Sequence, residues 1–192
     1  MKAMSPLTRK ELLAVLQAAR ESSVRGHCIF LLAYAHGLRA TETAQLRLAD
    51  LNVKDWTLRI ERLKRSKVTT QTLSPNSERL LDERKALRAW LDARPNFGPY
   101  LFSKPNGGCL SRIQVYRLFR QYAKVAGLPD AKRSPHALKH TLGQDLVNGK
   151  WDLARVQAAL GHASISSTAH YFAVSDSQAD EARQSVLMSA PR

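Results

Sequence analysis

The segment from Gly26 to Ala35 constrains the fold most, because it is apolar on nearly every side. A helix without a polar face has to be surrounded by other elements, so we expect this one at the centre of the protein. Upstream, Thr8 and Glu11 have the spacing of a capping box, which predicts the start of an amphipathic helix. A chain of 192 residues is long enough for one complete hydrophobic core. We therefore expect a single domain over residues 1–192.

Most of the remaining chain has helical patterns, and one region has the pattern of strands. Residues 56–62 roughly alternate in polarity and residues 67–73 are rich in Val and Thr, which predicts two antiparallel strands. A loop is expected over 94–108, where prolines and glycines gather. Further helices are expected, in chain order, over residues 40–48, 77–91, 111–126, 136–147, 152–160, 164–172 and 177–188. The predicted fold class is mainly α with a small antiparallel β-hairpin or sheet.

The chain carries an excess of positive charge, with 30 Lys and Arg residues against 16 Asp and Glu residues and a net charge of +14. Such an excess favours a polyanionic partner, most often nucleic acid, although a solvated basic surface would give the same count. The two cysteines, Cys28 and Cys109, are too few for a disulfide framework. The apolar run ending at Ala35 is too short to span a membrane, and the N-terminus lacks a signal-peptide pattern. These features predict a cytoplasmic protein that associates with the nucleoid.

Several basic residues fall in patterns that suit a phosphate group. Arg39 follows the apolar segment, and an arginine can donate two parallel hydrogen bonds to a phosphate from its planar guanidinium. Glu42, three residues later, can orient it, although a simple surface ion pair between the two is the alternative. His136, Lys139 and His140 have the spacing i, i+3, i+4, which places them on one helical face and predicts an anion site.

The two histidines of that face also resemble half of a zinc site. In the hydrolytic zinc motif the residue after the first histidine is glutamate, whereas Ala137 stands there in this chain. No acidic residue lies within the first turn of the predicted helix. We therefore expect no metal at His136 and His140.

The basic segment from Arg62 to Lys67 is expected near the turn between the two strands. A lysine there can lie beside a leaving oxygen and protonate it, because its pKa shifts readily when it is buried among other cations. The alternative is a hairpin that only holds backbone phosphates. This second interpretation suits Arg62, Arg65 and Lys67, whereas both interpretations remain open for Lys64.

A histidine and a tyrosine further along complete the pattern. His162 directly follows Gly161, which ends a predicted helix, and Tyr171 lies on the next one. Each of them alone is more often a surface or core residue. A tyrosine hydroxyl attacks phosphorus only where cations hold the phosphate oxygens and a proton donor serves the leaving oxygen. With the basic residues upstream, His162 and Tyr171 indicate a site that breaks and rejoins a DNA phosphodiester.

These residues resemble the tyrosine recombinases, the phage-integrase family that includes the Xer proteins and Cre. The resemblance extends from about Leu7 to about Phe172. It rests on the family's first arginine box, its hairpin lysine, its His-x-x-Arg-His box, its final histidine and its nucleophile. The matching residues, in that order, are Gly37 to Glu42, Lys64, His136 to His140, Leu160 to His162, and Tyr171.

The resemblance implies a reaction and a division of roles. Tyr171 would form a 3′-phosphotyrosyl bond with the DNA and free a 5′-hydroxyl, and Lys64 would protonate the leaving oxygen, with no metal or other cofactor. The implied substrate is double-stranded DNA, on which four protomers and two duplexes form the family's synapse. The implied catalytic residues, followed by the supporting ones, are Arg39, Lys64, His136, Lys139, His162 and Tyr171, then Glu42 and His140.

Two departures from the family pattern matter. Lys139 stands where the family has its second arginine, and we expect no N-terminal DNA-clamping domain, a build that the short fimbrial phase-switching recombinases share. The first departure keeps a second interpretation open, a non-catalytic DNA-binding or regulatory paralogue, and a topoisomerase-like nicking enzyme would share the nucleophile. The tail over residues 176–192 is expected to form a helix that is exchanged between protomers or folds back on its own domain.

Overall fold

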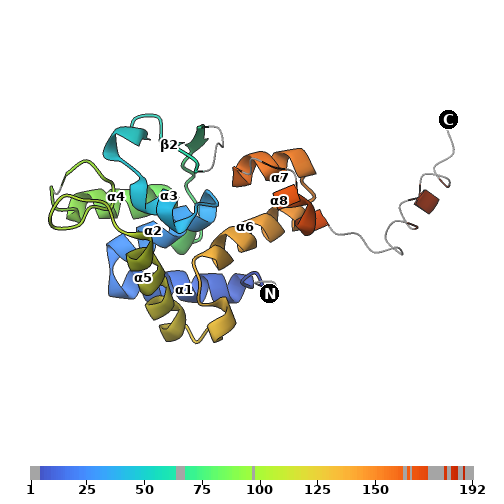
Figure 1. Cartoon of the computed structure of the whole chain (residues 1–192), viewed down its shortest axis with the longest axis horizontal. Coiled ribbons are helices and arrows are strands. Elements are labelled where there is room, and N and C mark those ends of the chain that lie inside the picture. The colour runs from blue at the N-terminus through green and yellow to red at the C-terminus, as the bar shows by residue number, and fades with distance from the viewer. Residues whose placement is uncertain are drawn as a thin grey trace.

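The structure is a computed structural model that describes residues 5–63, 68–96, 98–161, 164, 166–172, 180, 183–185 and 188. It is mainly helical with one small antiparallel sheet, which confirms the predicted fold class. Figure 1 shows α4 and α5 towards one end of the molecule and α6, α7 and α8 towards the other, with α2 between them. Within the described residues, no helix has both the length and the apolar character needed to cross a membrane.

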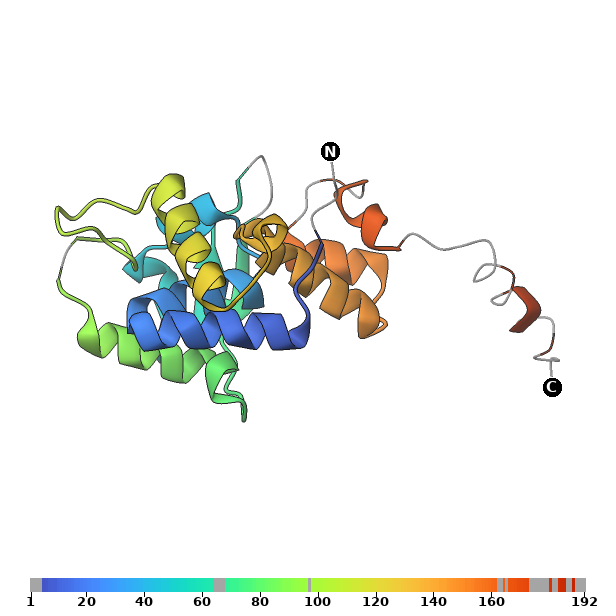
Figure 2. The ribbon, with the colours of Figure 1, turned by 90° about the horizontal axis from the view of Figure 1, so that it is seen from below.

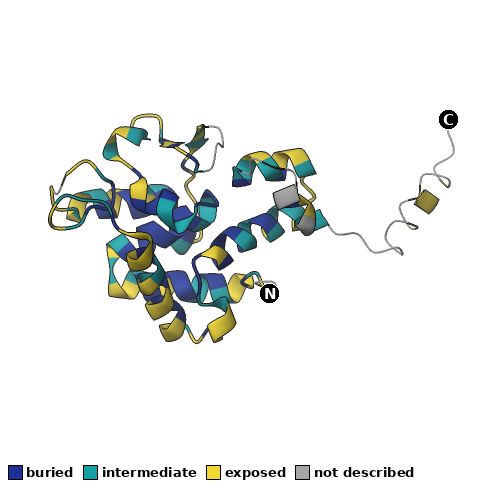
Figure 3. Cartoon of the chain, in the orientation of Figure 1, coloured by how far each residue is buried: buried dark blue, intermediate teal, exposed yellow. Residues whose placement is uncertain are grey.

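The central helix is α2, Val24–Ala35, and it is buried from Gly26 to Ala33, as predicted. It packs against α1, Arg9–Ser22, whose first turn has the expected capping box between Thr8 and Glu11. Phe30 of α2 makes edge-on contacts with two rings of α5, at centroid distances of 5.2 Å to Phe119 and 5.7 Å to Tyr122. Figure 3 shows that the buried residues lie mostly where these helices face one another. The apolar segment is therefore the core around which the other helices pack.

The sheet follows a short helix, α3, Ala40–Gln45, and a 3-10 turn, η1, Leu48–Asp50. Its three strands, in the order β1-β2-β3, are β1, Leu51–Asn52, β2, Thr57–Ile60, and β3, Thr69–Thr72. The pairing of β2 with β3 is the predicted hairpin, and its register aligns Ile60 with Thr69. The sequence pattern misses β1 because two residues are too few to alternate. The predicted helix over 40–48 is shorter because Leu46 is no longer helical, with ψ of 133°.

Helix α4, Glu83–Ala93, follows a separate 3-10 turn, η2, Arg79–Leu81. The expected helix over 77–91 begins later because Asp82 is extended, with ψ of 98°, and caps α4 by accepting a hydrogen bond from the Lys85 amide at 2.9 Å. The loop before α5, Arg112–Val125, contains the buried residues Leu101 and Phe102. A capping box at Ser111 and a glycine at 127 bound α5, as predicted.

After a 3-10 turn, η3, Asp130–Lys132, the chain forms α6, His136–Asn148, and α7, Leu153–Leu160, both within the predicted ranges or a residue beyond. The helix expected over 164–172 is divided into α8, Ser166–Ala169, and a 3-10 turn, η4, His170–Phe172. Figure 2 shows α6 and α7 side by side, with α8 above them in that view. The tail helix expected over 177–188 lies outside the described residues, except for residues 180, 183–185 and 188.

Candidate active site

The chain reverses sharply between α2 and α3, and this turn carries Arg39. Gly37 has a φ of +56°, and a Cβ at this position would lie 3.0 Å from a Leu160 methyl group, so glycine is required here. Arg39 then caps α3 and donates to Glu42 twice, from its guanidinium and from its backbone amide, at 2.8 Å each. The Arg39 side chain is 26% exposed and the Glu42 side chain is fully buried. Glu42 therefore orients Arg39, which keeps part of its guanidinium open to a ligand.

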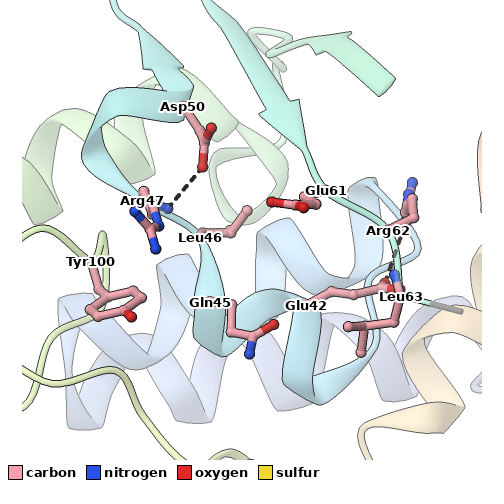
Figure 4. A pocket seen from close by; sticks show the side chains of 9 residues that line it. All are labelled: Glu42, Gln45, Leu46, Arg47, Asp50, Glu61, Arg62, Leu63 and Tyr100. Carbon is pink, nitrogen blue, oxygen red and sulfur yellow. Dashed lines mark hydrogen bonds and ion pairs between the residues drawn. The ribbon is translucent and has the colours of Figure 1, made fainter. Parts of the chain in front are cut away.

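The Glu42 carboxylate is ionised inside the protein. Burial would raise its pKa, but the hydrogen bonds from Arg39 and Leu63 and the charge of Lys139 lower the pKa of Glu42 below its ordinary value. The amide of Leu63 donates to Glu42 Oε1 at 3.2 Å, so the carboxylate also fixes the end of the segment that follows β2. Figure 4 shows Glu42 of α3 beside Arg62 and Leu63.

Arg62 does not lie on the surface. Its side chain is fully buried, 3.5 Å from Glu42, and its guanidinium donates to the carbonyls of His36, Gly37 and Ala159 at 2.9, 3.3 and 3.3 Å. Arg62 was predicted to bind DNA, whereas in the structure its guanidinium is held by partners inside the protein. A basic run in the sequence does not reveal that one of its members points inward.

Lys139 is also buried, although His136 and His140 lie on the same side of α6. Its ammonium donates to the carbonyls of Gly37 at 2.9 Å and Leu160 at 2.6 Å. Burial and the positive charges of Arg39 and Arg62 lower the pKa of Lys139 to about 7, against the opposing effect of Glu42. Lys139 therefore contributes charge from beneath the site, with two of its three donors already used by the backbone.

The site accordingly gathers more positive than negative charge. Arg39, Arg62 and Lys139 surround one buried carboxylate, Glu42, within the range at which each affects the others. His136 opens α6 with its side chain exposed, and partial desolvation and the charges of Arg39 and Lys139 lower its pKa. An imbalance of this kind favours the binding of an anion.

Tyr171 lies against α6, over the same helical face. Its hydroxyl and Nδ1 of His140 share a hydrogen bond of 2.9 Å. A Cβ at Gly143 would lie 2.5 Å from Cζ of the Tyr171 ring, so glycine at this position allows the ring to pack directly on the helix. Burial raises the pKa of Tyr171 to about 12, which keeps the hydroxyl protonated at neutral pH. The structure thus brings together Arg39, Glu42 and Lys139, and it places His140, the next residue of α6, against Tyr171.

Four of the residues singled out from the sequence lie outside the described part of the chain. They are Lys64, Arg65, Lys67 and His162. Among the described residues, no group of three or more His, Cys, Asp or Glu side chains is arranged to hold a metal ion.

A basic helical face next to the site was missed in the sequence. Helix α5 exposes Arg112, Arg117 and Arg120 together with Ile113, which is 62% exposed, and it contains no acidic residue. Arg112 is close enough to His136 to lower the pKa of that histidine. The signal was available, since the apolar stripe of α5 leaves Arg117 and Arg120 on the solvent side and Arg112 lies in the exposed first turn.

The hollow beside α3 has a different character. It encloses about 360 Å³ and is drawn in Figure 4. Its lining includes Glu42, Asp50 and Glu61, and it lacks Arg39, His136 and Tyr171. These carboxylates outnumber the two arginines of the lining, Arg47 and Arg62, so the hollow has no excess of positive charge. The candidate site is therefore the positively charged region around Arg39 and α6 rather than this hollow.

Comparison with known proteins supports the same assignment of family. Residues 6–178 match the model of the phage integrase family. The chain is 34% identical over 174 residues to the type 1 fimbriae regulatory protein FimE of Escherichia coli K12, and the match covers 87% of this chain and 84% of FimE. It is 31% identical over 179 residues to the tyrosine recombinase XerA of Pyrococcus furiosus, covering 92% of this chain and 59% of XerA.

Solved structures have the same fold. A crystal structure of XerA recombinase superposes with a TM-score of 0.75 and 25% identity, over 97% of this chain and 65% of that one. A post-cleavage complex of the XerH site-specific recombinase with its difH substrate superposes with a TM-score of 0.74 and 23% identity, over 95% of this chain and 53% of that one. The chain therefore spans only about half to two thirds of these recombinases. With the match to the family model over most of its length, this chain belongs to the phage integrase family.

Proposed function

We propose that this protein is a site-specific DNA recombinase that cleaves and rejoins DNA through a 3′-phosphotyrosyl intermediate. The observation that carries the proposal is the position of Tyr171, whose hydroxyl is hydrogen-bonded to His140 on the α6 face that adjoins the charged cluster of Arg39 and Lys139. A nucleophile beside a base and an unbalanced positive cluster suits attack on a phosphodiester. Family membership supports the same chemistry.

The proposed reaction exchanges one phosphate ester for another. The Tyr171 oxygen attacks the scissile phosphorus and forms a phosphotyrosyl bond, while the bond from phosphorus to the 5′-oxygen breaks. The hydroxyl proton passes to a base, for which His140 at 2.9 Å is placed, and Lys64 supplies a proton to the leaving 5′-oxygen. Because the ester bond is conserved, attack by a 5′-hydroxyl reverses the step and rejoins the strand without a cofactor.

The remaining site residues would stabilise the charge on the phosphate. Arg39 is the partly exposed guanidinium and would hold the non-bridging oxygens, with His136 and His162 as further donors. Lys139 would add charge from below rather than contact both oxygens, since its ammonium already binds two carbonyls. The exposed face of α5, with Arg112 at its near end, would follow the DNA backbone.

The test is covalent trapping on nicked suicide oligonucleotides that cover the DNA flanking the gene. Wild type should leave a protein–DNA adduct that resists denaturation. Tyr171→Phe should bind the same DNA and give no adduct, because it lacks the attacking oxygen. Tyr116→Phe, which removes a hydroxyl from the α5 face, is the matched control and should still react. An adduct with Tyr171→Phe would contradict the assignment of Tyr171 as the nucleophile. Formation of a recombined DNA product would distinguish a recombinase from a simple nicking enzyme.

A second function is a DNA-binding regulator without catalysis. The observation that favours it is Lys139, which stands in place of the family's second arginine and has its ammonium turned towards backbone carbonyls. This alternative predicts specific DNA binding with no adduct from wild type and from Lys139→Arg.

The tail over residues 176–192 and a four-protomer synapse belong to the recombinase proposal. Deletion of the tail should then abolish recombination, while single protomers still bind DNA.

A further inference from the structure

Two buried cations converge on the end of α7. The last carbonyls of a helix lack partners within the helix and carry partial negative charge, which cations stabilise. In this protein the carbonyl of Ala159 accepts a hydrogen bond from Arg62 at 3.3 Å, and that of Leu160 accepts one from Lys139 at 2.6 Å. Both cations also donate to one oxygen, the carbonyl of Gly37, at 3.3 and 2.9 Å. The end of α7 is thereby tied to the turn between α2 and α3.

Arg62 connects this contact between α7 and the α2–α3 turn to Glu42, the partner of Arg39. Its guanidinium lies 3.5 Å from Glu42 and 2.9 Å from the carbonyl of His36, while it reaches Ala159 on the other side. Only a planar group with several donors can meet partners in so many directions, and a lysine ammonium is a single point. Arg62 therefore joins the region of residues 36–42 to the end of α7, which is far away in the sequence.

The glycine after α7 fits this arrangement closely. Gly161 has a φ of +61°, and a Cβ at this position would lie 2.5 Å from Nε and 2.9 Å from Cζ of Arg62. The Gly161 backbone therefore lies directly on the guanidinium. His162, a residue of the proposed site, comes next in the chain.

We propose that Arg62 is a positioning residue, which fixes the turn at Gly161 relative to Arg39 by holding the end of α7, Glu42 and the α2–α3 turn together. The inference rests on the proposed function in one respect, namely that the turn at Gly161 and Arg39 act on the same phosphate. Arg62 contacts no DNA in this role. It acts through the backbone of α7 and through Glu42.

The experiment compares Arg62→Lys and Arg62→Met with Arg59→Lys and Arg59→Met. Arg59 is the matched control because it lies on β2, is 53% exposed and, among the residues that the structure describes, pairs only with Asp50. Thermal unfolding first establishes that each variant is folded. At saturating suicide DNA, Arg62→Lys should cleave roughly 10- to 100-fold more slowly, the scale expected when reacting groups are displaced by about 1 Å, with unchanged DNA affinity. The Arg59 variants should cleave as wild type does.

A second measurement does not depend on activity. Hydrogen exchange of peptides from α7 should become faster in Arg62→Lys and Arg62→Met than in the Arg59 variants, because the carbonyl of Ala159 loses the Arg62 guanidinium. Unchanged exchange would overturn the proposal. Faster exchange with normal cleavage at saturating DNA would also overturn it, since Arg62 would then only stabilise the fold. If the wild-type protein binds DNA and never forms an adduct, the proposed function is contradicted instead. The hydrogen-exchange measurement would then still decide whether Arg62 holds the turn at Gly161.

A double-mutant cycle tests the contact itself. Gly161→Ala should slow cleavage as Arg62→Lys does, because the added methyl group displaces the guanidinium. In an Arg62→Ala background this clash is gone, and Gly161→Ala should cost less than it does alone, leaving only the strain of a positive φ. Strictly additive losses would show that the two residues act separately and would contradict the proposal.

Discussion

Lys139 combines two properties that oppose each other. Its ammonium donates to two carbonyls, yet it lies beside Arg39 and Arg62 in a buried environment that lowers its pKa to about 7. The folded protein therefore releases a proton near neutral pH that the unfolded chain keeps until its ordinary pKa of 10.5. Small changes of pH thus alter the charge of the site in the free protein.

The pKa shift of Lys139 should make the stability of the protein depend on pH, and unfolding experiments can measure this dependence. Below pH 7 both states are protonated, and the cost of burying the charge is fully present. Above about pH 7 the unfolded state binds more protons than the folded state, so the free energy of unfolding contributed by Lys139 rises with pH. The free energy of unfolding of Lys139→Met, measured in urea, should lack this rise. The stability of wild type relative to the variant should therefore increase between about pH 6 and about pH 9. The exposed Lys85→Met is the control, and a gap independent of pH would contradict the shift.

On the proposed function, the same residue should also determine how cleavage depends on pH. Arginine stays charged at every pH used and adds a second donor. The ratio of the Lys139→Arg rate to the wild-type rate should therefore increase with pH above about 7 and reach roughly 5- to 30-fold, which corresponds to about 1–2 kcal/mol of transition-state stabilisation. Single-turnover cleavage across this range checks it, with thermal unfolding to confirm that the larger side chain fits. A ratio that falls with pH would mean that neutral Lys139 is the active form.

Helix α6 provides the surface on which Tyr171, the proposed nucleophile, packs. The ring of Tyr171 occupies the space that a side chain at position 143 would need, and His140, one turn earlier, binds its hydroxyl. The reactive oxygen is therefore located by α6 rather than by the short elements α8 and η4 that contain Tyr171.

Replacing Gly143 by alanine should displace Tyr171 from α6. In a helix interior this change normally stabilises by about 1 kcal/mol, but here the new methyl group overlaps the ring. We expect loss of the covalent adduct together with lower stability in Gly143→Ala. In the Tyr171→Ala background the same change should be neutral or stabilising by up to about 1 kcal/mol in urea unfolding. Equal destabilisation in both backgrounds would show that the ring does not occupy this space.

The elements with strong local signals are the ones that the sequence predicts correctly. Capping boxes at Thr8 and Ser111 and glycines at 37, 127 and 161 act within one or two turns, so their effects are visible in the chain itself. The burial of Arg62 could not be predicted, because it depends on partners at positions 36, 42 and 159, which only the tertiary fold brings together. The two-residue β1 likewise forms only because Leu51 meets Leu58 of β2.

At the scale of the whole molecule, the net charge of +14 is distributed unevenly. The arginines of α5 are exposed, and one of them, Arg112, lies near His136, whereas α4 packs on α2 and pairs part of its charge with Asp82. The α5 side is therefore the surface on which we expect the DNA backbone to lie.

DNA binding should depend steeply on salt, and α5 should account for part of the slope. Each phosphate contact contributes about −0.9 to the slope of log K against log salt concentration. Arg117→Ala and Arg120→Ala should each reduce the steepness by about 1, measured by fluorescence anisotropy at several salt concentrations. Lys85→Ala on α4 removes the same charge and should leave the slope unchanged. Equal effects at α4 and α5 would mean that only the total charge matters.

The contacts of Arg62 and Leu63 mark the point in the chain after which a segment could be replaced by protein engineering. On one side the chain is fixed to Glu42 and the end of α7, and on the other Thr69 is paired with Ile60 in the sheet. An insert grafted in place of residues 65–67 would therefore be joined at two firm attachment points. It would replace Arg65 and Lys67 and would leave Lys64 and Arg39 untouched. DNA preference and chemical rate should in that case be separable traits, so that libraries of this tripeptide could retarget the enzyme without rebuilding its centre.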